Sequence, residues 1–375
     1  MEWIKLSEPQ FEDVISSEVN EAILKKEVGY VGGYIDAFTN QLRDYLNVPH
    51  IGLFSSGTAS IHLALKLLDV KSGDEVICQS LTFVASVNPV TYLGAKPIFI
   101  GSEVSGWNMS PNYLAAALED RKSKGRQVKA IIVVHLYGMP ANMEEIMRLS
   151  REYDVPVIED AAEALGSKTS KGFCGTLADL GILSFNANKI ITTGGGGALL
   201  AKSEELITNA RFLGLQAKDP APHYEHSQLG FNYAFSNLNA VLGFSQFKQI
   251  ESKIGKRRAA YEHYKKNIEA KGYITFQEGY LDDFSNRWLT AITVPDNSIS
   301  VKLQQYLSEN FVETRPVWKP IHLQPLYKDC DYFGDRLEED LFYNGICLPS
   351  GSGLGEEQLF KVTDLLNKFM KPHCS

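Results

Sequence analysis

The stretch AIIVVHLYGMPANMEEIMRLSREYDVPVIEDAA (130–162) decides the fold. It opens with an apolar run at 130–138 that is typical of a buried strand, continues with a helical segment at 144–153, and ends with a second apolar run at 155–162. A strand, a helix and a further strand in this order predict two parallel strands joined by a crossover helix.

The same alternation extends from this stretch toward both termini. Strand-like runs occur at 50–54, 75–79, 96–100 and 180–185, and a helix-like segment at 59–68. The pattern predicts an α/β fold in which helices cover both faces of a mostly parallel sheet. Ligands of such sheets bind beyond the carboxyl ends of the strands, which here carry SSGT (55–58), HLYG (135–138), EDAAE (159–163) and SFNANK (184–189).

The alternation weakens after about residue 245. Residues 246–272 have the pattern of a long amphipathic helix with a basic stretch, 287–294 resemble a strand, and 356–370 a final helix. We therefore expect a large domain at 1–245 and a smaller C-terminal α+β domain at 246–375.

The composition argues against several classes of protein. The 375 residues are 44% hydrophobic and 22% charged, as in soluble globular proteins, and the net charge of −8 argues against a general nucleic-acid surface. Neither a membrane span nor a secretory signal is indicated. Five scattered cysteines predict reduced thiols in a cytoplasmic protein: Cys78, Cys174, Cys330, Cys347 and Cys374.

Two of the predicted strand ends suit an anionic and a cationic group of one ligand. The small residues Ser55–Ala59 expose backbone N–H groups at a helix N-terminus, which suits a phosphate, although a plain capped turn has the same pattern. Asp160 ends a buried apolar run, where a carboxylate needs a partner. A protonated ring nitrogen would be such a partner, and so would a structural cation.

A lysine and an aromatic ring complete the pattern. Lys189 follows the run at 180–185 and precedes four glycines (194–197), so it is either an amine nucleophile in a partly dry pocket or an ordinary surface lysine. Phe83 follows another strand and either stacks on a flat ligand or belongs to the core. The four features occur in the chain order that is typical of fold-type I enzymes that use pyridoxal phosphate (PLP).

At these residues the sequence resembles the DegT/DnrJ/EryC1/StrS family of sugar-nucleotide aminotransferases. The resemblance spans nearly the whole chain and includes SSGTASIHLAL, SLTFVASVNPV, EDAAEALGS, SFNANKIITTGGGGALL, GFNYAFSNLNAVLG, TRPVWKPIHLQPLY and CLPSGS. Within the family, four motifs are most similar to the C4-aminotransferases of the UDP-bacillosamine type: SFNANKIITT (184–193), HYEH (223–226), SNRWL (285–289) and RPVWKPIH (315–322).

The resemblance implies a role for each matching residue. Lys189 would carry the cofactor as a Schiff base and Asp160 would face its ring nitrogen. The remaining cofactor residues would be Glu163 at the ring oxygen, Phe83 on the ring, Gly57, Thr58 and Ser184 at the phosphate, and Asn232 reaching the neighbouring subunit of a homodimer. The sugar nucleotide would be surrounded by Gly29, Tyr30, Val31, Gly32, Ser56, Asn188, Arg315, Trp318 and His322.

The implied reaction has two halves. L-Glutamate leaves its amino group on the cofactor as pyridoxamine phosphate, and the C4 keto group of UDP-4-keto-6-deoxy-N-acetylglucosamine then receives it, in the synthesis of a cell-surface polysaccharide or glycan. GDP- or TDP-linked 3-keto or 4-keto sugars remain open as substrates. A related dehydratase would carry histidine in place of Lys189, and a non-catalytic PLP-binding protein would be expected to carry an added domain.

The chain departs from the family pattern at two places, and its histidines also need an interpretation. The family has a basic residue where this chain has Ala234, so we expect Arg315 or Lys319 to compensate, and we regard the GGGG run as a tolerated variant. His223 and His226 do not have the spacing of a zinc-binding helix, so we expect no metal site there. His135 is expected to pack near the cofactor pocket without a catalytic role.

Overall fold

A large sheet forms the centre of the protein. The computed structural model describes residues 2–11, 15–270 and 272–373. Among them, eight strands pair in the order β1-β9-β8-β5-β4-β2-β3-β13. The pairs are parallel except that β9 runs antiparallel to both β1 and β8, so the predicted mostly parallel sheet is confirmed. The strands are β1 (His50–Phe54), β2 (Glu75–Gln79), β3 (Lys96–Ile100), β4 (Val128–Val134), β5 (Val157–Asp160), β8 (Leu180–Ser184), β9 (Gly197–Ala201) and β13 (Tyr332–Phe333).

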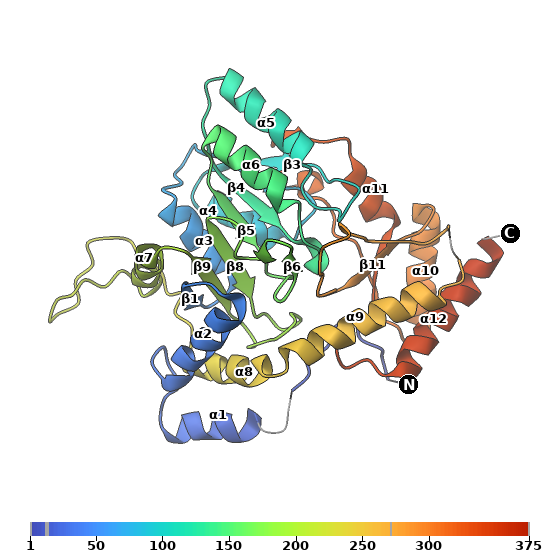
Figure 1. Ribbon diagram of the computed structural model, residues 1–375, viewed down its shortest axis with the longest axis horizontal. Coiled ribbons are helices and arrows are strands. Elements are labelled where there is room, and N and C mark those ends of the chain that lie inside the picture. The colour runs from blue at the N-terminus through green and yellow to red at the C-terminus, as the bar shows by residue number, and fades with distance from the viewer. Residues whose placement is uncertain (1, 12–14, 271, 374–375) are drawn as a thin grey trace.

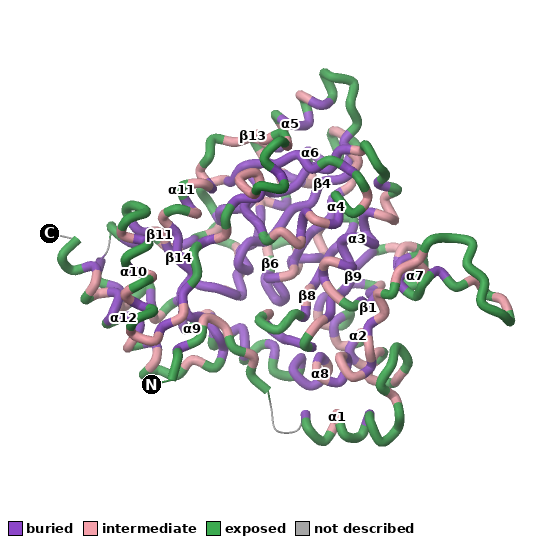
Figure 2. Tube along the Cα trace, turned by 180° about the vertical axis from the view of Figure 1, so that it is seen from behind, coloured by how far each residue is buried: buried purple, intermediate pink, exposed green. Residues whose placement is uncertain are grey.

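Helices cover both faces of this sheet. Successive residues of a strand point to opposite faces, and in the central strands both sets are apolar, so both faces must be buried. Ile132 and Ile158 pack toward α3 and α7, whereas Ile131 and Val133 pack toward α5 and α6. The covering helices surround the sheet in Figure 1, and Figure 2 shows that its central strands are buried. They are α2 (Gly33–Leu46), α3 (Gly57–Leu67), α4 (Asn88–Tyr92), α5 (Pro111–Ser123), α6 (Met143–Tyr153), α7 (Glu204–Gly214) and α8 (Asn237–Phe247).

A second, antiparallel sheet lies in the C-terminal part. Its order is β10-β11-β14-β12. The strands are β10 (Thr275–Phe276), β11 (Thr290–Thr293), β12 (Arg315–Pro316) and β14 (Gly345–Leu348), accompanied by α9 (Ile250–Asn267), α10 (Asn297–Glu309), α11 (Leu337–Asn344) and α12 (Glu356–Met370). The other elements within the described ranges are α1 (Ile15–Leu24), the hairpin β6 (Lys168–Thr169) and β7 (Gly172–Phe173), and four short 3₁₀ segments: Val84–Ser86, Leu136–Gly138, Ile321–Leu323 and Lys371–His373.

The chain crosses between the two sheets more than once. β13 comes from the C-terminal part and pairs with β3 of the large sheet, so that Tyr332 lies opposite Phe99. In the other direction, Ile4 pairs with Val312, and both belong to a core cluster of the C-terminal part. The division at residue 246 stays a prediction, and these crossings show that each part contributes residues to the other.

Two segments differ from their predicted form. The helix expected over 246–272 starts only at Ile250, after α8 has ended at Phe247, and its buried stripe includes the cations Lys253 and Arg257. The strand expected over 130–138 ends at Val134, because the backbone turns at Tyr137 with a φ of 55°. The final helix at 356–370 is confirmed.

Two further observations concern membranes and thiols. Within the described residues, no helix is both long and apolar enough to cross a membrane. The cysteines of that part carry free thiols: Cys78, Cys174, Cys330 and Cys347. Cys374 lies outside the described residues.

Candidate active site

A cavity of about 710 Å³ lies at the carboxyl ends of the central strands. Asp160 ends β5, and the parallel register places it beside Val134 of β4 and Ile182 of β8. The opposite wall comes from the second sheet and includes Arg315 and Cys347. The volume is within the range of small-molecule sites. The cavity therefore lies where the sequence predicts a ligand.

Lys189 and Glu163 face each other in this cavity. The Nζ atom of Lys189 lies 3.3 Å from Oε1 of Glu163 and 4.2 Å from the ring centroid of Trp288. The second oxygen of Glu163 accepts the N–H of Tyr137 at 2.8 Å. Burial raises the pKa of Glu163 to about 7, although the nearby Lys189 ammonium opposes the rise. The pair thus contains a carboxyl group that titrates near neutral pH.

The raised pKa of Glu163 predicts a pH-dependent difference between the cofactor-free protein and its Glu163→Gln variant. Folding favours the neutral carboxyl, so this stabilising contribution is fully present below pH 4.5 and is lost as pH rises through about 7. The free energy of unfolding of the wild type, relative to that of the variant, should fall by roughly 3 kcal/mol across this window. Urea titrations at several pH values measure the difference, and a constant difference would contradict the assignment.

Asp160 is a buried carboxylate whose hydrogen-bond donors are neutral. Oδ2 accepts the hydroxyl of Ser86 at 2.7 Å, and Oδ1 accepts the N–H of Ala162 at 3.0 Å. The side chain lines the cavity. A buried carboxylate gains most from a positive partner, and the protonated ring nitrogen of PLP is such a partner. This observation fits the cofactor that the sequence predicts.

The N-terminus of α3 supplies a place for a phosphate. Ser56 caps the helix by accepting the N–H of Ala59 at 3.0 Å. Gly57 and Thr58, in the first turn, line the cavity together with Ser184 at the end of β8. First-turn N–H groups and hydroxyls bind phosphate well. The predicted phosphate residues are therefore brought together.

Phe83 offers an aromatic face to the same cavity. The side chain is 54% exposed and its ring centroid lies 5.5 Å from that of Trp318. A large ring that remains accessible inside a cavity can stack on a flat ligand. Asp160, Lys189, the α3 turn and Phe83 are thus suited, in turn, to the ring nitrogen, the reactive carbonyl carbon, the phosphate and the ring of PLP.

The glycine run at 194–197 packs against the turn at the start of α3, where the phosphate is predicted to bind. Gly195 and Gly196 line the cavity, as expected for a close approach to a ligand. Gly197 has a different role, since an added Cβ would lie 2.4 Å from the backbone N of Gly57 and 2.4 Å from the carbonyl carbon of Ser56. The start of β9 and the start of α3 therefore touch through their backbones, and this contact requires glycine.

A Gly197→Ala variant should be destabilised and should bind PLP more weakly, because the new methyl group must displace the turn at Ser56 and Gly57. Overpacking of this kind costs about 1–3 kcal/mol. Thermal unfolding and cofactor titration measure the two effects. Gly255→Ala is the matched control, because an added Cβ at that helical position meets no atom within 4 Å. Equal behaviour of the two variants would refute the packing argument.

The structure brings only part of the predicted substrate set to the cavity. Ser56, Asn188, Arg315 and Trp318 line it, as does Lys319. The predicted substrate residues that do not are Gly29, Tyr30, Val31, Gly32 and His322. Asn232, predicted to reach the cofactor of the neighbouring subunit, also lies outside the cavity of its own subunit. Gly29 and Gly32 contact Asn237 at the start of α8, and Tyr30, Val31 and Asn232 are exposed.

His322 is held in a polar network away from the cavity. Nδ1 lies 2.6 Å from the hydroxyl of Ser80, Nε2 lies 3.3 Å from Glu339, and the ring stacks on Tyr332. Ile321 also donates its N–H to the carbonyl of Ser80 at 2.8 Å. These contacts attach the segment that follows Trp318 to the large sheet, which gives His322 a structural role in this conformation.

Several cavity residues carry no clear signal in the sequence. Leu6 and Ser7 reach the cavity from the N-terminal segment, and Cys347 from β14. Glu313 binds Arg315 at 2.8 Å and accepts the N–H of Leu6 at 3.2 Å. Burial raises the pKa of the Cys347 thiol to about 12, so it stays protonated at neutral pH. Leu6, Ser7 and Glu313 lie outside the quoted motifs, and the motif CLPSGS contains Cys347 without assigning it a role.

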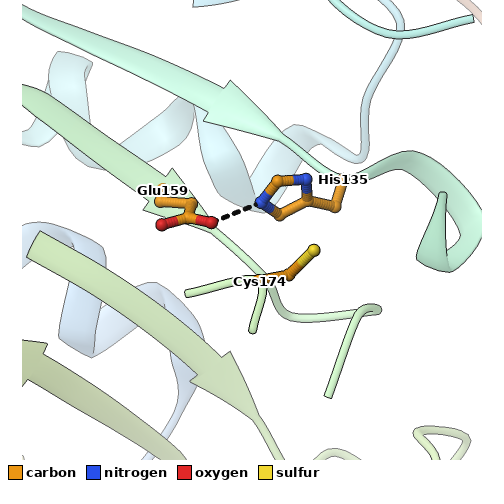
Figure 3. Close-up of side chains that lie close together, drawn as sticks. All are labelled: His135, Glu159 and Cys174. Carbon is orange, nitrogen blue, oxygen red and sulfur yellow. Dashed lines mark hydrogen bonds and ion pairs between the residues drawn. The ribbon is translucent and has the colours of Figure 1, made fainter. Parts of the chain in front are cut away.

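His135, Glu159 and Cys174 form a buried cluster beside the site (Figure 3). Nδ1 of His135 accepts the N–H of Ala141 at 2.9 Å, which places the ring proton on Nε2, 2.7 Å from Glu159. The carboxylate also accepts three backbone N–H groups, those of Gly175, Leu177 and Ala178. The nitrogen and oxygen atoms that could bind a metal are therefore engaged in hydrogen bonds that hold two loops at the end of β5.

His223 and His226 lie on an exposed loop. His223 contacts Glu225 at 3.1 Å, and Nδ1 of His226 lies 2.9 Å from the carbonyl oxygen of Gln216. This loop follows α7 and extends from the body of the protein in Figure 1. The two histidines are thus remote from the cavity.

Comparison with known proteins identifies a family of aminotransferases. Residues 10–367 match the DegT/DnrJ/EryC1/StrS aminotransferase family. The pyridoxal phosphate-dependent aminotransferase EpsN of Bacillus subtilis is 43% identical, covering 97% of this chain and 95% of that protein. GDP-perosamine synthase of Escherichia coli O157:H7 is 34% identical and covers 98% and 99%. A UDP-4-amino-4,6-dideoxy-N-acetyl-beta-L-altrosamine transaminase of Campylobacter jejuni is 34% identical over 67% of this chain and 66% of its own length.

A solved structure extends the likeness to the whole fold. The aminotransferase TlmJ from Streptoalloteichus hindustanus has a TM-score of 0.92 at 25% identity, covering 99% of this chain and 100% of that one. The arrangement of both sheets is therefore that of a known type of aminotransferase.

Proposed function

Because this chain belongs to the DegT/DnrJ/EryC1/StrS aminotransferase family, whose members use PLP to aminate sugars, we propose that it aminates the C4 keto group of a nucleotide-linked 4-keto-6-deoxy sugar with L-glutamate as donor. The observation that carries the proposal is the cavity in which Lys189, Asp160 and the α3 turn meet. Each of these groups suits a different part of the cofactor.

PLP, when bound, supplies an electrophilic carbon that takes up the amino group and a ring that stores the electron pair released at the substrate carbon. Asp160 would hold the proton on the ring nitrogen, and Phe83 would cover one face of the ring. The Lys189 amine removes a proton from the α-carbon of the donor and, in the second half of the reaction, delivers a proton to C4 of the sugar. When the amine of Lys189 is released from the cofactor, Glu163 would bind it as an ion pair.

The preferred acceptor is UDP-4-keto-6-deoxy-N-acetylglucosamine. The motifs at 285–289 and 315–322 support this choice, and so does the transaminase relative whose name describes a UDP-linked 4-amino-4,6-dideoxy N-acetyl sugar. A GDP-linked 4-keto-6-deoxy sugar is the second candidate, because the GDP-perosamine synthase relative matches along nearly the whole chain. Arg315 and Lys319 are the cavity cations that would meet the diphosphate in place of the residue missing at Ala234.

Incubation of the purified protein with glutamate and a panel of UDP-, GDP- and TDP-linked keto sugars tests the proposal. The expected product is the aminated UDP sugar, detected by a mass change that corresponds to replacement of the keto oxygen by an amino group. Amination of the GDP sugar alone would replace the preferred acceptor by the second candidate. No amination of any sugar, with the cofactor bound and glutamate present, would overturn the assignment.

The proposal extends to the assembly and the setting of the enzyme. Asn232 is exposed and lies outside the cavity of its own subunit, which supports a homodimer in which it reaches the phosphate of the neighbouring cofactor. We place the enzyme in the cytoplasm, in the synthesis of a cell-surface polysaccharide or glycan, with a large domain at 1–245 and a small one at 246–375. Sedimentation as a monomer of 41.7 kDa would refute the dimer.

A further inference from the structure

Trp288 contacts both the side chain of Lys189, which carries the proposed chemistry, and the carbonyl of the residue before it. The indole Nε1 donates to the carbonyl of Asn188 at 2.7 Å, and the ring centroid lies 4.2 Å from Nζ of Lys189. The side chain is buried and lines the cavity. We infer that Trp288 is a positioning residue for Lys189, an inference that rests on the proposed role of that lysine.

The first contact fixes the backbone from which the lysine projects. The Asn188 carbonyl belongs to the peptide bond that joins Asn188 to Lys189, and it also accepts the hydroxyl of Ser7 at 3.2 Å. The N–H of Lys189 donates to the carbonyl of Asn186 at 3.0 Å. Both sides of this peptide bond are therefore held, although it lies in a turn beyond the end of β8.

A buried arginine holds both donors in place. Nη1 of Arg257 donates to the carbonyl of Trp288 at 2.6 Å, and Nη2 donates to the hydroxyl of Ser7 at 3.1 Å. Burial lowers the pKa of Arg257 to about 10, which still leaves it charged at neutral pH. The hydrogen bonds thus form a closed circuit through Arg257, Ser7, Asn188 and Trp288.

The second contact gives the side chain of Lys189 a defined place when its nitrogen is free. The indole face attracts the ammonium, and Glu163 binds it at 3.3 Å. The ring of Trp288 is itself supported by that of Tyr137, which is stacked at 6.3 Å. A lysine that alternates between a bound and a free state would therefore stay within the cavity, directed toward the same carbon in each cycle.

The test measures attachment of PLP to the cofactor-free full-length chain. In this step Nζ forms a C=N bond with the aldehyde carbon and one water molecule leaves. The product is reduced with borohydride and mapped by peptide mass. Trp288→Phe keeps a ring but loses the hydrogen bond, and attachment at Lys189 should slow by roughly three- to tenfold. Trp288→Leu loses both contacts, and attachment should slow by roughly ten- to a hundredfold.

Controls separate positioning from general stability. Trp3→Phe makes the same chemical change at a remote site, where Trp3 packs on Phe311, and should leave the rate unchanged. Ser7→Ala removes the other donor to the Asn188 carbonyl, so its effect should not simply add to that of Trp288→Phe. All rates are taken well below the unfolding midpoint of each variant.

The outcomes distinguish this inference from the proposed function. Attachment at Lys189 with the wild-type rate in both Trp288 variants would overturn the positioning role while leaving the proposed function intact. Attachment of the wild-type protein at a different lysine would overturn both. A slower rate in Trp288→Phe, and a still slower one in Trp288→Leu, would support the inference.

Discussion

Replacement of Lys189 by alanine is expected to abolish transamination almost completely. Loss of a positioned acid–base group costs about 10²–10⁴-fold in rate, and loss of the covalent anchor for the cofactor adds to this. The fold should persist, because Lys189 is partly exposed to the cavity and its contacts there are with Glu163 and Trp288. The variant should therefore be folded and inactive.

The measurement follows the visible spectrum during mixing with glutamate, together with borohydride reduction and peptide mapping. Lys168→Ala is the matched control, since Lys168 is exposed, lies outside the cavity lining and contacts the partly buried rings of Phe173 and Phe284 through its ammonium group. Its spectrum and its rate should equal those of the wild type. A Lys189→Ala protein that still carries a lysine-linked cofactor and reacts with glutamate at the normal rate would refute the assignment.

Replacement of Asp160 by asparagine should have the second largest effect. The amide keeps the shape, its oxygen can still accept the N–H of Ala162, and its NH2 group can donate to the hydroxyl oxygen of Ser86. The substitution nevertheless removes the negative charge that would face the ring nitrogen. Removal of one partner from a buried charge pair costs about 3–5 kcal/mol, which corresponds to a rate loss of roughly two to four orders of magnitude.

Ser86→Ala is the control for Asp160→Asn. It removes the hydroxyl that donates to Oδ2 but leaves the carboxylate charged. Loss of one such hydrogen bond to a charged group costs about 1.5–3 kcal/mol, so its rate should fall less than that of the charge variant. Both half-reactions are followed in stopped flow. Equal rates for Asp160→Asn and the wild type would show that the charge of Asp160 has no part in catalysis.

The sequence predicts the central sheet well, because its strands are short apolar runs whose ends carry unusual residues. Asp160 and Ser184 were expected at one edge of the sheet, and the parallel register of β4, β5 and β8 brings both to one cavity. Chain order alone is enough for this, since parallel strands end on the same side. The antiparallel strand β9 could not be recognised, as the glycines before it dominate that segment.

The residues from distant segments could not be predicted. Ser7 and Trp288 meet Asn188 only after the second sheet has packed on the first, and no local periodicity marks either residue. His322 lies in a matching motif but does not line the cavity, so its contact with the substrate stays a prediction. Its side chain is instead hydrogen-bonded to Ser80 and Glu339. Ser80 is far from it along the chain, so this contact forms only when the chain folds.

The strand β13 has a consequence for how the molecule can be divided. It protects the edge of β3, and the segment before it packs Ile321 and Tyr327 into the same core as Phe99. A fragment that ended with the large domain would leave an apolar sheet edge unpaired, and such edges promote aggregation. Neither part of the chain is therefore expected to fold by itself, so gene fusions and domain exchanges should keep the chain whole.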